Sequence, residues 1–193
     1  LKLRLENISD DKLQSQMRQD LNDMIAMLDA TLTYLHEQRT SEALQLMDVQ
    51  ALVESLCENA QDQGADVHVS GHCAPLPVQP MALRSCLNNL MDNALRYAGQ
   101  ARIELHDQRE QLLICVIDHG PGIAEDKREA VFEPFFRLEG SRNRNSGGVG
   151  LGMTIAREAA QRLGGQLNLE ETPGGGLTAI IRLWLDAQQP GEQ

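Results

Sequence analysis

The stretch NNLMDNALRYAG, residues 88–99, decides how the rest of the chain is interpreted. Its apolar residues continue a pattern that begins at Pro80, and they predict a helix over residues 80–97. Asn89 and Asn93 are four residues apart, so both side chains project from the same helix face. An amide is costly to bury unless it forms a hydrogen bond or binds a ligand, and amide oxygens suit Mg²⁺. The helix therefore carries a candidate ligand-binding pair.

The end of this helix adds two side chains that suit a phosphorylated ligand with a planar group. Arg96 offers hydrogen-bond donors and positive charge to phosphates. Tyr97 offers an aromatic wall. Both follow Asn93 by about one helical turn, so the predicted helix holds the three groups close together.

The segment IDHGPGI, residues 117–123, ends an apolar strand with a carboxylate and a sharp turn. A lone carboxylate at the end of a buried strand can accept a hydrogen bond from an exocyclic amine, which distinguishes adenine from guanine. Asp118 is the candidate for this role. Gly120 and Gly122 let a planar base approach the backbone, because glycine has no side chain.

The segment GGVGLGM, residues 147–153, leads directly into a predicted helix. Glycines followed by a helix N-terminus form a site for anions such as phosphate. The segment does not follow a strand and lacks the G-K-[ST] ending, which excludes the Rossmann and P-loop motifs. Asparagine pairs, Asp-x-Gly turns and glycine runs can each have a purely structural role. Their joint occurrence around one predicted sheet indicates a nucleotide site.

The remaining pattern beyond residue 45 predicts an α/β fold. Helices and strands interleave without a repeated βαβ period, so we expect a two-layer sandwich of a mixed sheet and helices. The predicted helices span 48–63, 80–97 and 154–163, and the predicted strands span 66–70, 102–106, 111–118, 166–170 and 177–185.

Residues 1–45 have a different composition, with no glycine and no proline. A break at residues 7–11 separates a short helical tail, residues 1–6, from a long helix. Apolar residues recur along that helix at steps of three and four and predict a seam that pairs with another helix. The seam residues are Leu13, Met17, Leu21, Met24, Leu28, Leu32 and Leu35. We expect a truncated helical hairpin that dimerises; the alternative is a helix packed on its own globular domain.

Charge and cysteine usage limit the function classes further. The chain carries 28 acidic and 17 basic residues, and a net charge of -11 disfavours a nucleic-acid partner. No apolar run is long enough to span a membrane, and no signal peptide is recognisable. The cysteines form no C-x-x-C pair, which suits buried thiols in a reducing compartment. They are Cys57, Cys73, Cys86 and Cys115. These features predict a cytoplasmic location.

Five segments together resemble the sensor histidine kinases of two-component systems. In chain order they are similar to the N, G1, F and G2 boxes and the last glycine-rich element of that family. They are NNLMDNALRY (88–97), DHGPGI (118–123), FEPFFR (132–137), GGVGLGM (147–153) and TPGGGLTAIIRL (172–183). The F box separates this resemblance from the chaperone, gyrase and mismatch-repair ATPases. The resemblance implies the Bergerat ATP-binding sandwich.

The resemblance also implies cofactors and residue roles. The cofactors are ATP and Mg²⁺, with Asn93 on the metal and Asn89 and Arg96 beside the phosphates. Asp118 would accept from the adenine amine, with Thr178 supporting it through water. The other implied nucleotide contacts are Tyr97, Gly120, Gly122, Gly148, Gly150, Leu151 and Gly152. Residues 132–146 would form a mobile lid.

The stretch HEQRTS, residues 36–41, is similar to the family's phosphoacceptor motif but departs from it. Ser41 stands where the motif has proline, and His36 falls at the end of the second predicted helix instead of the first. We interpret His36 as a solvated histidine and expect the acceptor upstream of Leu1. His68, His72 and Cys73 lack a fourth metal ligand and are interpreted as strand and turn residues.

The resulting hypothesis is the cytoplasmic catalytic portion of a sensor histidine kinase. Its predicted domains are a truncated dimerisation hairpin (1–45), a catalytic ATP-binding domain (46–187) and a tail (188–193). The intact protein, anchored in the inner membrane, would pass the γ-phosphoryl of ATP to a histidine and then to a response-regulator receiver domain. A second protomer is the other expected partner. The alternatives are a dimerisation module with a degenerate nucleotide site and a non-kinase ATPase of the same fold.

Overall fold

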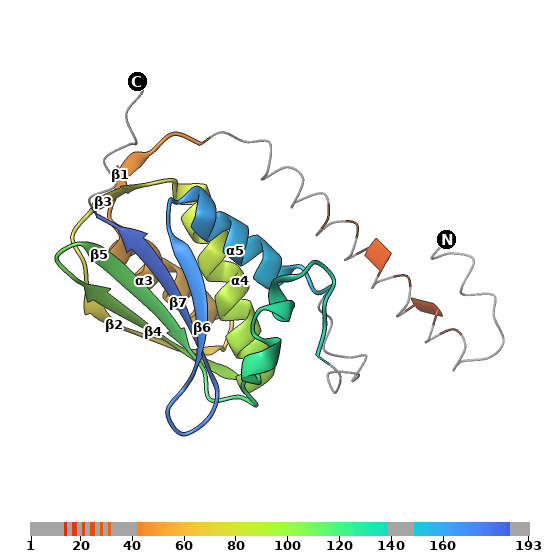
Figure 1. Cartoon of the computed structure of the whole chain (residues 1–193). Helices are drawn as coiled ribbons and strands as arrows, with labels where there is room; N and C mark the ends of the chain where they lie inside the picture. Colours follow the sequence, from red (N-terminus) through yellow and green to blue (C-terminus); the bar gives the residue numbers. More distant parts are fainter. Residues whose placement is uncertain are drawn as a thin grey trace.

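The computed structural model describes residues 42–138 and 149–185, together with eight single positions between 14 and 31. The chain contains three helices and seven strands in these two ranges, with two short 3₁₀ turns (Figure 1). In order they are β1 (Gln45–Met47), α3 (Val49–Asp62), β2 (Asp66–His72), β3 (Leu76–Val78), α4 (Pro80–Ala98), β4 (Gln100–Asp107), β5 (Gln111–Ile117), η1 (Glu125–Lys127), η2 (Ala130–Phe132), α5 (Gly152–Arg162), β6 (Gln166–Glu171) and β7 (Leu177–Trp184).

Five strands form one mixed sheet in the order β2-β4-β5-β7-β6. β2 pairs with β4 in parallel, whereas the other neighbours pair antiparallel. β1 and β3 form a separate antiparallel pair. β5 and β7 are distant in the chain but adjacent in the sheet. Their pairing brings the G1 segment beside the last glycine-rich segment.

The helices cover one face of the five-stranded sheet, with α4 and α5 side by side (Figure 1). Side chains alternate along the strands, and one set is buried under the helices. On β4, for example, Ala101, Ile103 and Leu105 are buried, whereas Arg102 and His106, which alternate with them, are exposed. The buried residues of the helices and strands form one core cluster. The predicted two-layer α/β sandwich is confirmed.

The ends of the helices follow from local chemistry. Asp48 caps α3, because its Oδ1 accepts a hydrogen bond from the backbone nitrogen of Ala51 at 2.9 Å. α4 begins with Pro80 and ends at Gly99, whose φ of 74° is the left-handed conformation that glycine adopts easily. Gln79 precedes Pro80 but gives α4 no side-chain cap.

All helices and strands predicted beyond residue 45 are present, and no end is shifted by more than two residues. The sequence pattern missed β1 and β3, because three-residue strands are too short to show an alternating pattern. Glu42, just before the predicted start of the catalytic domain at residue 46, contacts the first turn of α4. The described positions between 14 and 31 are helical. The rest of the predicted hairpin, with His36, lies outside the described residues.

Four apolar side chains on these helical positions are exposed, with exposed fractions of 40–63%: Met17, Met24, Ile25 and Leu28. Three of them belong to the predicted seam, which leaves the hairpin's dimerisation as an open prediction. In the described part of the chain, no helix has the length and hydropathy needed to cross a membrane.

Candidate functional site

The carboxylate of Asp118 is held by the backbone at the end of β5. The side chain is 8% exposed, and its Oδ1 accepts hydrogen bonds from Gly120 N at 2.8 Å and Leu177 N at 3.2 Å. The nitrogen of Asp118 donates in turn to the carbonyl of Leu177 at 2.9 Å. Both described bonds to the carboxylate use Oδ1. A fixed, nearly buried carboxylate of this kind suits recognition of one donor group.

Glycines allow three segments to meet around Asp118. A Cβ on Gly176 would lie 2.1 Å from the carbonyl oxygen of Asp118, so only glycine fits between β7 and the G1 segment. A Cβ on Gly122 would lie 2.9 Å from the carbonyl oxygen of Gly176. On the other side, a Cβ on Gly120 would lie 3.1 Å from the carbonyl oxygen of Tyr97. The turn after β5 is therefore confined between the end of α4 and the β6–β7 turn.

The asparagine pair of α4 faces the beginning of α5. A Cβ on Gly152 would lie 3.2 Å from Asn89 Oδ1 and 3.9 Å from both Oδ1 and Nδ2 of Asn93. Asn89 donates from Nδ2 to the carbonyl of Ser85 at 2.9 Å, which leaves its oxygen directed elsewhere. Both asparagines are half-buried. The structure thus brings the predicted metal-binding amides to a helix N-terminus.

The chain approaches α5 through Gly150 and Leu151. Gly150 has a φ of 80°, and its carbonyl accepts a hydrogen bond from Phe135 N at 2.9 Å. Leu151 is 3% exposed and anchors the first turn through its carbonyl, which accepts from Ile155 N at 2.9 Å. Gly148 lies outside the described residues.

Arg96 and Tyr97 lie at the end of α4, and both side chains are exposed. Tyr97 has an exposed fraction of 46%. Its position beside Gly120 places it on the same side of the fold as Asp118. The end of α4 therefore lies beside the turn that follows Asp118, and the asparagine pair on the same helix lies beside Gly152.

Thr178 is not brought to the carboxylate. The register pairs Thr178 with Ile117, and it places Leu177 opposite Asp118. Because side chains alternate along a strand, Thr178 points to the sheet face away from the helices. Its hydroxyl lies 2.9 Å from that of Thr172 instead. Leu177, which is packed against the core, is the β7 residue on the same face as Asp118.

Two residues that shape this region were not singled out from the sequence. Gly176 was part of a quoted glycine run, but the run contains three glycines and the pattern does not say which one is confined. Leu177 acts through its backbone, which leaves no signal in the residue type. Among the residues that the structure describes, no group of three or more histidines, cysteines or acids could hold a metal ion.

Comparison with known proteins identifies the family. Residues 78–189 match the family described as histidine kinase-, DNA gyrase B- and HSP90-like ATPases. The chain belongs to this family. The matched range includes α4, the G1 segment, α5 and the last two strands of the sheet, which together carry the candidate site.

The relatives place the chain among sensor histidine kinases. It is 36% identical over 184 residues to the sensor histidine kinase GtrS of Pseudomonas aeruginosa, and the match covers 95% of this chain and 38% of that protein. It is 35% identical over 137 residues to the sensor histidine kinase CpxA of Escherichia coli, covering 69% of this chain and 30% of that protein. The chain therefore spans well under half of these relatives.

The ATP binding domain of PrrB from Mycobacterium tuberculosis has a similar structure, with a TM-score of 0.62 and 25% sequence identity. The likeness covers 76% of this chain and 100% of that domain. The Bergerat sandwich implied by the sequence is thereby confirmed as the fold. The ATP-binding domain of a sensor histidine kinase is the description that fits both comparisons.

Proposed function

We propose that the chain is the catalytic ATP-binding portion of a two-component sensor histidine kinase and that it binds ATP with Mg²⁺. Asp118 accepts a hydrogen bond from the exocyclic amine of adenine, and Asn89 and Asn93 face the phosphates and the metal. The observation that carries this proposal is the Asp118 carboxylate, which is nearly buried and fixed by two backbone N–H groups.

Different side chains recognise the base and the phosphates of the nucleotide. Because Oδ1 of Asp118 already accepts two hydrogen bonds, Oδ2 is the oxygen suited to the base. The exocyclic amine of adenine can donate a hydrogen bond to this oxygen. Guanine has a carbonyl at the same ring position, which cannot donate, so the carboxylate favours adenine. The half-buried amides of Asn89 and Asn93 provide neutral oxygens at the N-terminus of α5, where phosphates are favoured.

Phosphoryl transfer depends mainly on positioning and charge neutralisation. Mg²⁺, when bound, supplies positive charge to the phosphates. In this chain Asn93 would hold the metal and Asn89 would flank it. Arg96 is exposed and lies three residues after Asn93 on α4, and its guanidinium would meet the outer phosphates. No described residue of this site supplies a nucleophile, which is in keeping with transfer to a histidine outside the site.

In the intact protein, the γ-phosphoryl would pass to a histidine and then to a response-regulator receiver domain. The structure of the histidine kinase ThkA in complex with the response regulator TrrA shares this fold, with a TM-score of 0.73 and 18% identity. It covers 95% of this chain and 55% of ThkA. We further propose a homodimer through the exposed seam of Met17, Met24 and Leu28, and an inner-membrane anchor outside this chain.

The alternative of a degenerate nucleotide site is disfavoured by the geometry. A degenerate site would tolerate loss of the carboxylate or of the close glycine contacts. Here Asp118 is present, and a Cβ on Gly120, Gly122 or Gly176 would lie 3.1, 2.9 or 2.1 Å from a backbone carbonyl oxygen. A non-kinase ATPase of the same family is the other alternative. The F-box segment, residues 132–137, supports the kinase.

Titration of the chain with ATP and GTP, with and without Mg²⁺, tests the proposal. Wild type should bind ATP more tightly than GTP. The Asp118→Asn variant should lose at least about tenfold in ATP affinity, because a hydrogen bond to a charged group contributes roughly 1.5–3 kcal/mol. Asp62→Asn is the matched control, since Asp62 is exposed at the end of α3. Failure of wild type to bind ATP would overturn the proposal and favour the degenerate module.

A further inference from the structure

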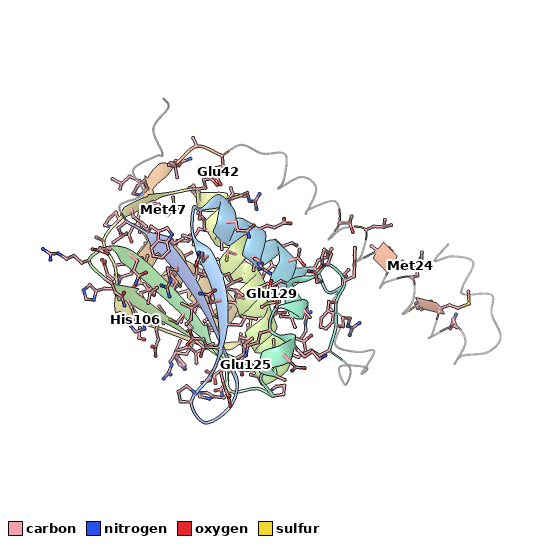
Figure 2. All side chains as sticks on the ribbon, in the orientation of Figure 1. Met24, Glu42, Met47, His106, Glu125 and Glu129 are labelled. Carbon is pink, nitrogen blue, oxygen red and sulfur yellow. The ribbon has the colours of Figure 1, made fainter. Side chains whose placement is uncertain are left out.

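Arg157, on the second turn of α5, contacts the start of the F box and the residues just before it in two ways. Its Nη2 lies 2.6 Å from Oε1 of Glu129. Its Cζ also lies 4.5 Å from the centre of the Phe132 ring, over the ring face. Figure 2 labels Glu129 on the part of the chain that lies beside α5. The guanidinium is thus held between a carboxylate and an aromatic ring.

A second contact joins the same two elements one turn earlier on α5. Thr154 donates from Oγ1 to the carbonyl of Phe132 at 2.9 Å. Both residues are buried, with exposed fractions of 5% and 7%. α5 therefore holds Phe132 through its backbone at Thr154 and through its ring at Arg157.

The same segment also contacts the chain just before α5. Phe135 N donates to the carbonyl of Gly150, and Phe135 has a φ of 66°, which is strained for a residue with a side chain. Gly152 lies between these two points of attachment, with Asn89 3.2 Å from its missing Cβ. The segment from Phe132 to Phe135 therefore fixes the N-terminus of α5 from both sides.

We propose that Arg157 is a positioning residue for the phosphates of the nucleotide, an inference that rests on the proposed function. It does not touch the nucleotide. It sets the position of the first turn of α5 against Asn89 and Asn93 by fixing that helix to Phe132. Loss of the Arg157 contacts lets the N-terminus of α5 shift, and a shift of this kind weakens contacts to phosphate but not to the base.

The relative weight of the two Arg157 contacts follows from exposure. Glu129 is 78% exposed, and ion pairs of exposed groups contribute little because water and salt screen them. Phe132 is buried, and the stacked guanidinium also shields the ring. The effect of substitution should therefore decrease in the order Arg157→Ala, Arg157→Lys, Glu129→Gln.

The test measures the dissociation constants of Mg–ATP and of adenosine for each variant. Adenosine reports the base site alone, so the ratio of the two constants isolates the phosphate-dependent part of binding. Arg157→Ala should weaken ATP binding by about tenfold and adenosine binding by less than about twofold, because a shift of α5 weakens charge-assisted hydrogen bonds to the phosphates and leaves the base site in place. Arg157→Lys should be intermediate, and Glu129→Gln should change ATP by less than about threefold.

Arg102→Ala is the matched control, because Arg102 also pairs with a glutamate, Glu104, at 3.1 Å but lies on the exposed sheet face. It should leave both constants unchanged. A thermal unfolding transition shows whether each variant is folded. Glu129→Gln is expected to fold normally, because the Glu129 side chain is exposed. Equal losses for ATP and adenosine, or no loss in Arg157→Ala, would overturn the inference. A wild-type chain that binds adenosine as tightly as ATP would instead overturn the proposed function.

Discussion

The side chain of Glu42 caps helix α4 at Met81. The two carboxylate oxygens lie 2.9 and 3.0 Å from Met81 N, and Oε2 also accepts from Ala82 N at 3.2 Å. The carbonyl of Glu42 accepts a further bond from Nε2 of Gln79 at 2.9 Å. α4 thus receives its cap from a residue far upstream, labelled in Figure 2, because Gln79 does not supply one. The chain arriving from the N-terminal part is thereby fixed to the helix that carries Asn89.

Removal of this cap should destabilise the protein. Glu42→Ala leaves two backbone donors at the positive end of α4 without their acceptor, and we expect a loss of about 1–2 kcal/mol in the free energy of unfolding. Urea denaturation measures the change, and hydrogen exchange should show faster exchange at Met81 and Ala82. Glu58→Ala, at an exposed position of α3, should change the stability by less than about 0.5 kcal/mol. Equal effects of the two substitutions would contradict a capping role.

Two glycines of the β6–β7 turn offer a matched comparison. Gly176 and Gly174 both have positive φ values, 119° and 89°, so alanine is strained at either position. A Cβ on Gly174 meets nothing within 4 Å, whereas one on Gly176 would overlap the carbonyl oxygen of Asp118. Gly174→Ala should cost about 1–2 kcal/mol and leave ATP affinity intact. Gly176→Ala should displace Asp118 and lower ATP affinity by at least about tenfold. Isothermal titration would show the difference, and similar affinities for both variants would argue against the confined position of Gly176.

The asparagines of α4 differ in their expected metal dependence. Asn93→Ala should weaken ATP binding strongly in the presence of Mg²⁺ and only slightly in EDTA, because the amide oxygen is the proposed ligand of the metal. Asn88→Ala is the control, since Asn88 is an exposed neighbour on the same helix. ATP titrations of both variants, with Mg²⁺ and in EDTA, measure this difference. If Asn93→Ala lost the same factor with and without Mg²⁺, Asn93 would not be the metal ligand.

The thiols should be protected in the folded protein. Burial raises the pKa of Cys86 to about 12, and burial together with Glu54 and Glu58 raises the pKa of Cys57 to about 11. Burial likewise raises the pKa of Cys73 and Cys115. Because thiolate is the reactive form, labelling by a thiol reagent at pH 8 should be roughly a hundredfold slower than in urea.

These raised pKa values also predict a pH dependence of stability. In the folded state the thiols stay neutral up to a higher pH than in the unfolded state, so their contribution is complete below about pH 9 and is lost as pH rises toward 11. The free energy of unfolding should therefore fall over that interval. A Cys57→Ala, Cys86→Ala variant should show a smaller fall, and an identical fall would assign it to other groups.

Much of the fold could be predicted from local pattern. The helix around residues 88–99 and the strand ending at Asp118 have strong periodicity and clear ends, and both appear within one or two residues of their predicted bounds. Asn89, Asn93 and Asp118 were recognisable because each is a polar residue where the pattern expects an apolar one. The four cysteines, predicted to be buried thiols, are indeed free and buried.

The features that the sequence did not reveal are those made between distant segments. The cap from Glu42 to Met81 depends on the pairing of β1 with β3, which no local signal predicts. The placement of Thr178 required the register of β7 against β5, since a shift of one residue reverses the face on which a side chain lies. The glycine that is confined could be identified only from the carbonyl packed against it.

The position of β7 between β5 and β6 has a consequence for the synthesis of the protein. Asp118 receives one of its two backbone hydrogen bonds from Leu177, near the C-terminal end of the chain. A nascent chain that has emerged only as far as α5 cannot complete the proposed base site, whatever the state of its helices. On the proposed function, ATP therefore binds only chains in which the last hairpin has docked, and by mass action it stabilises that folded state.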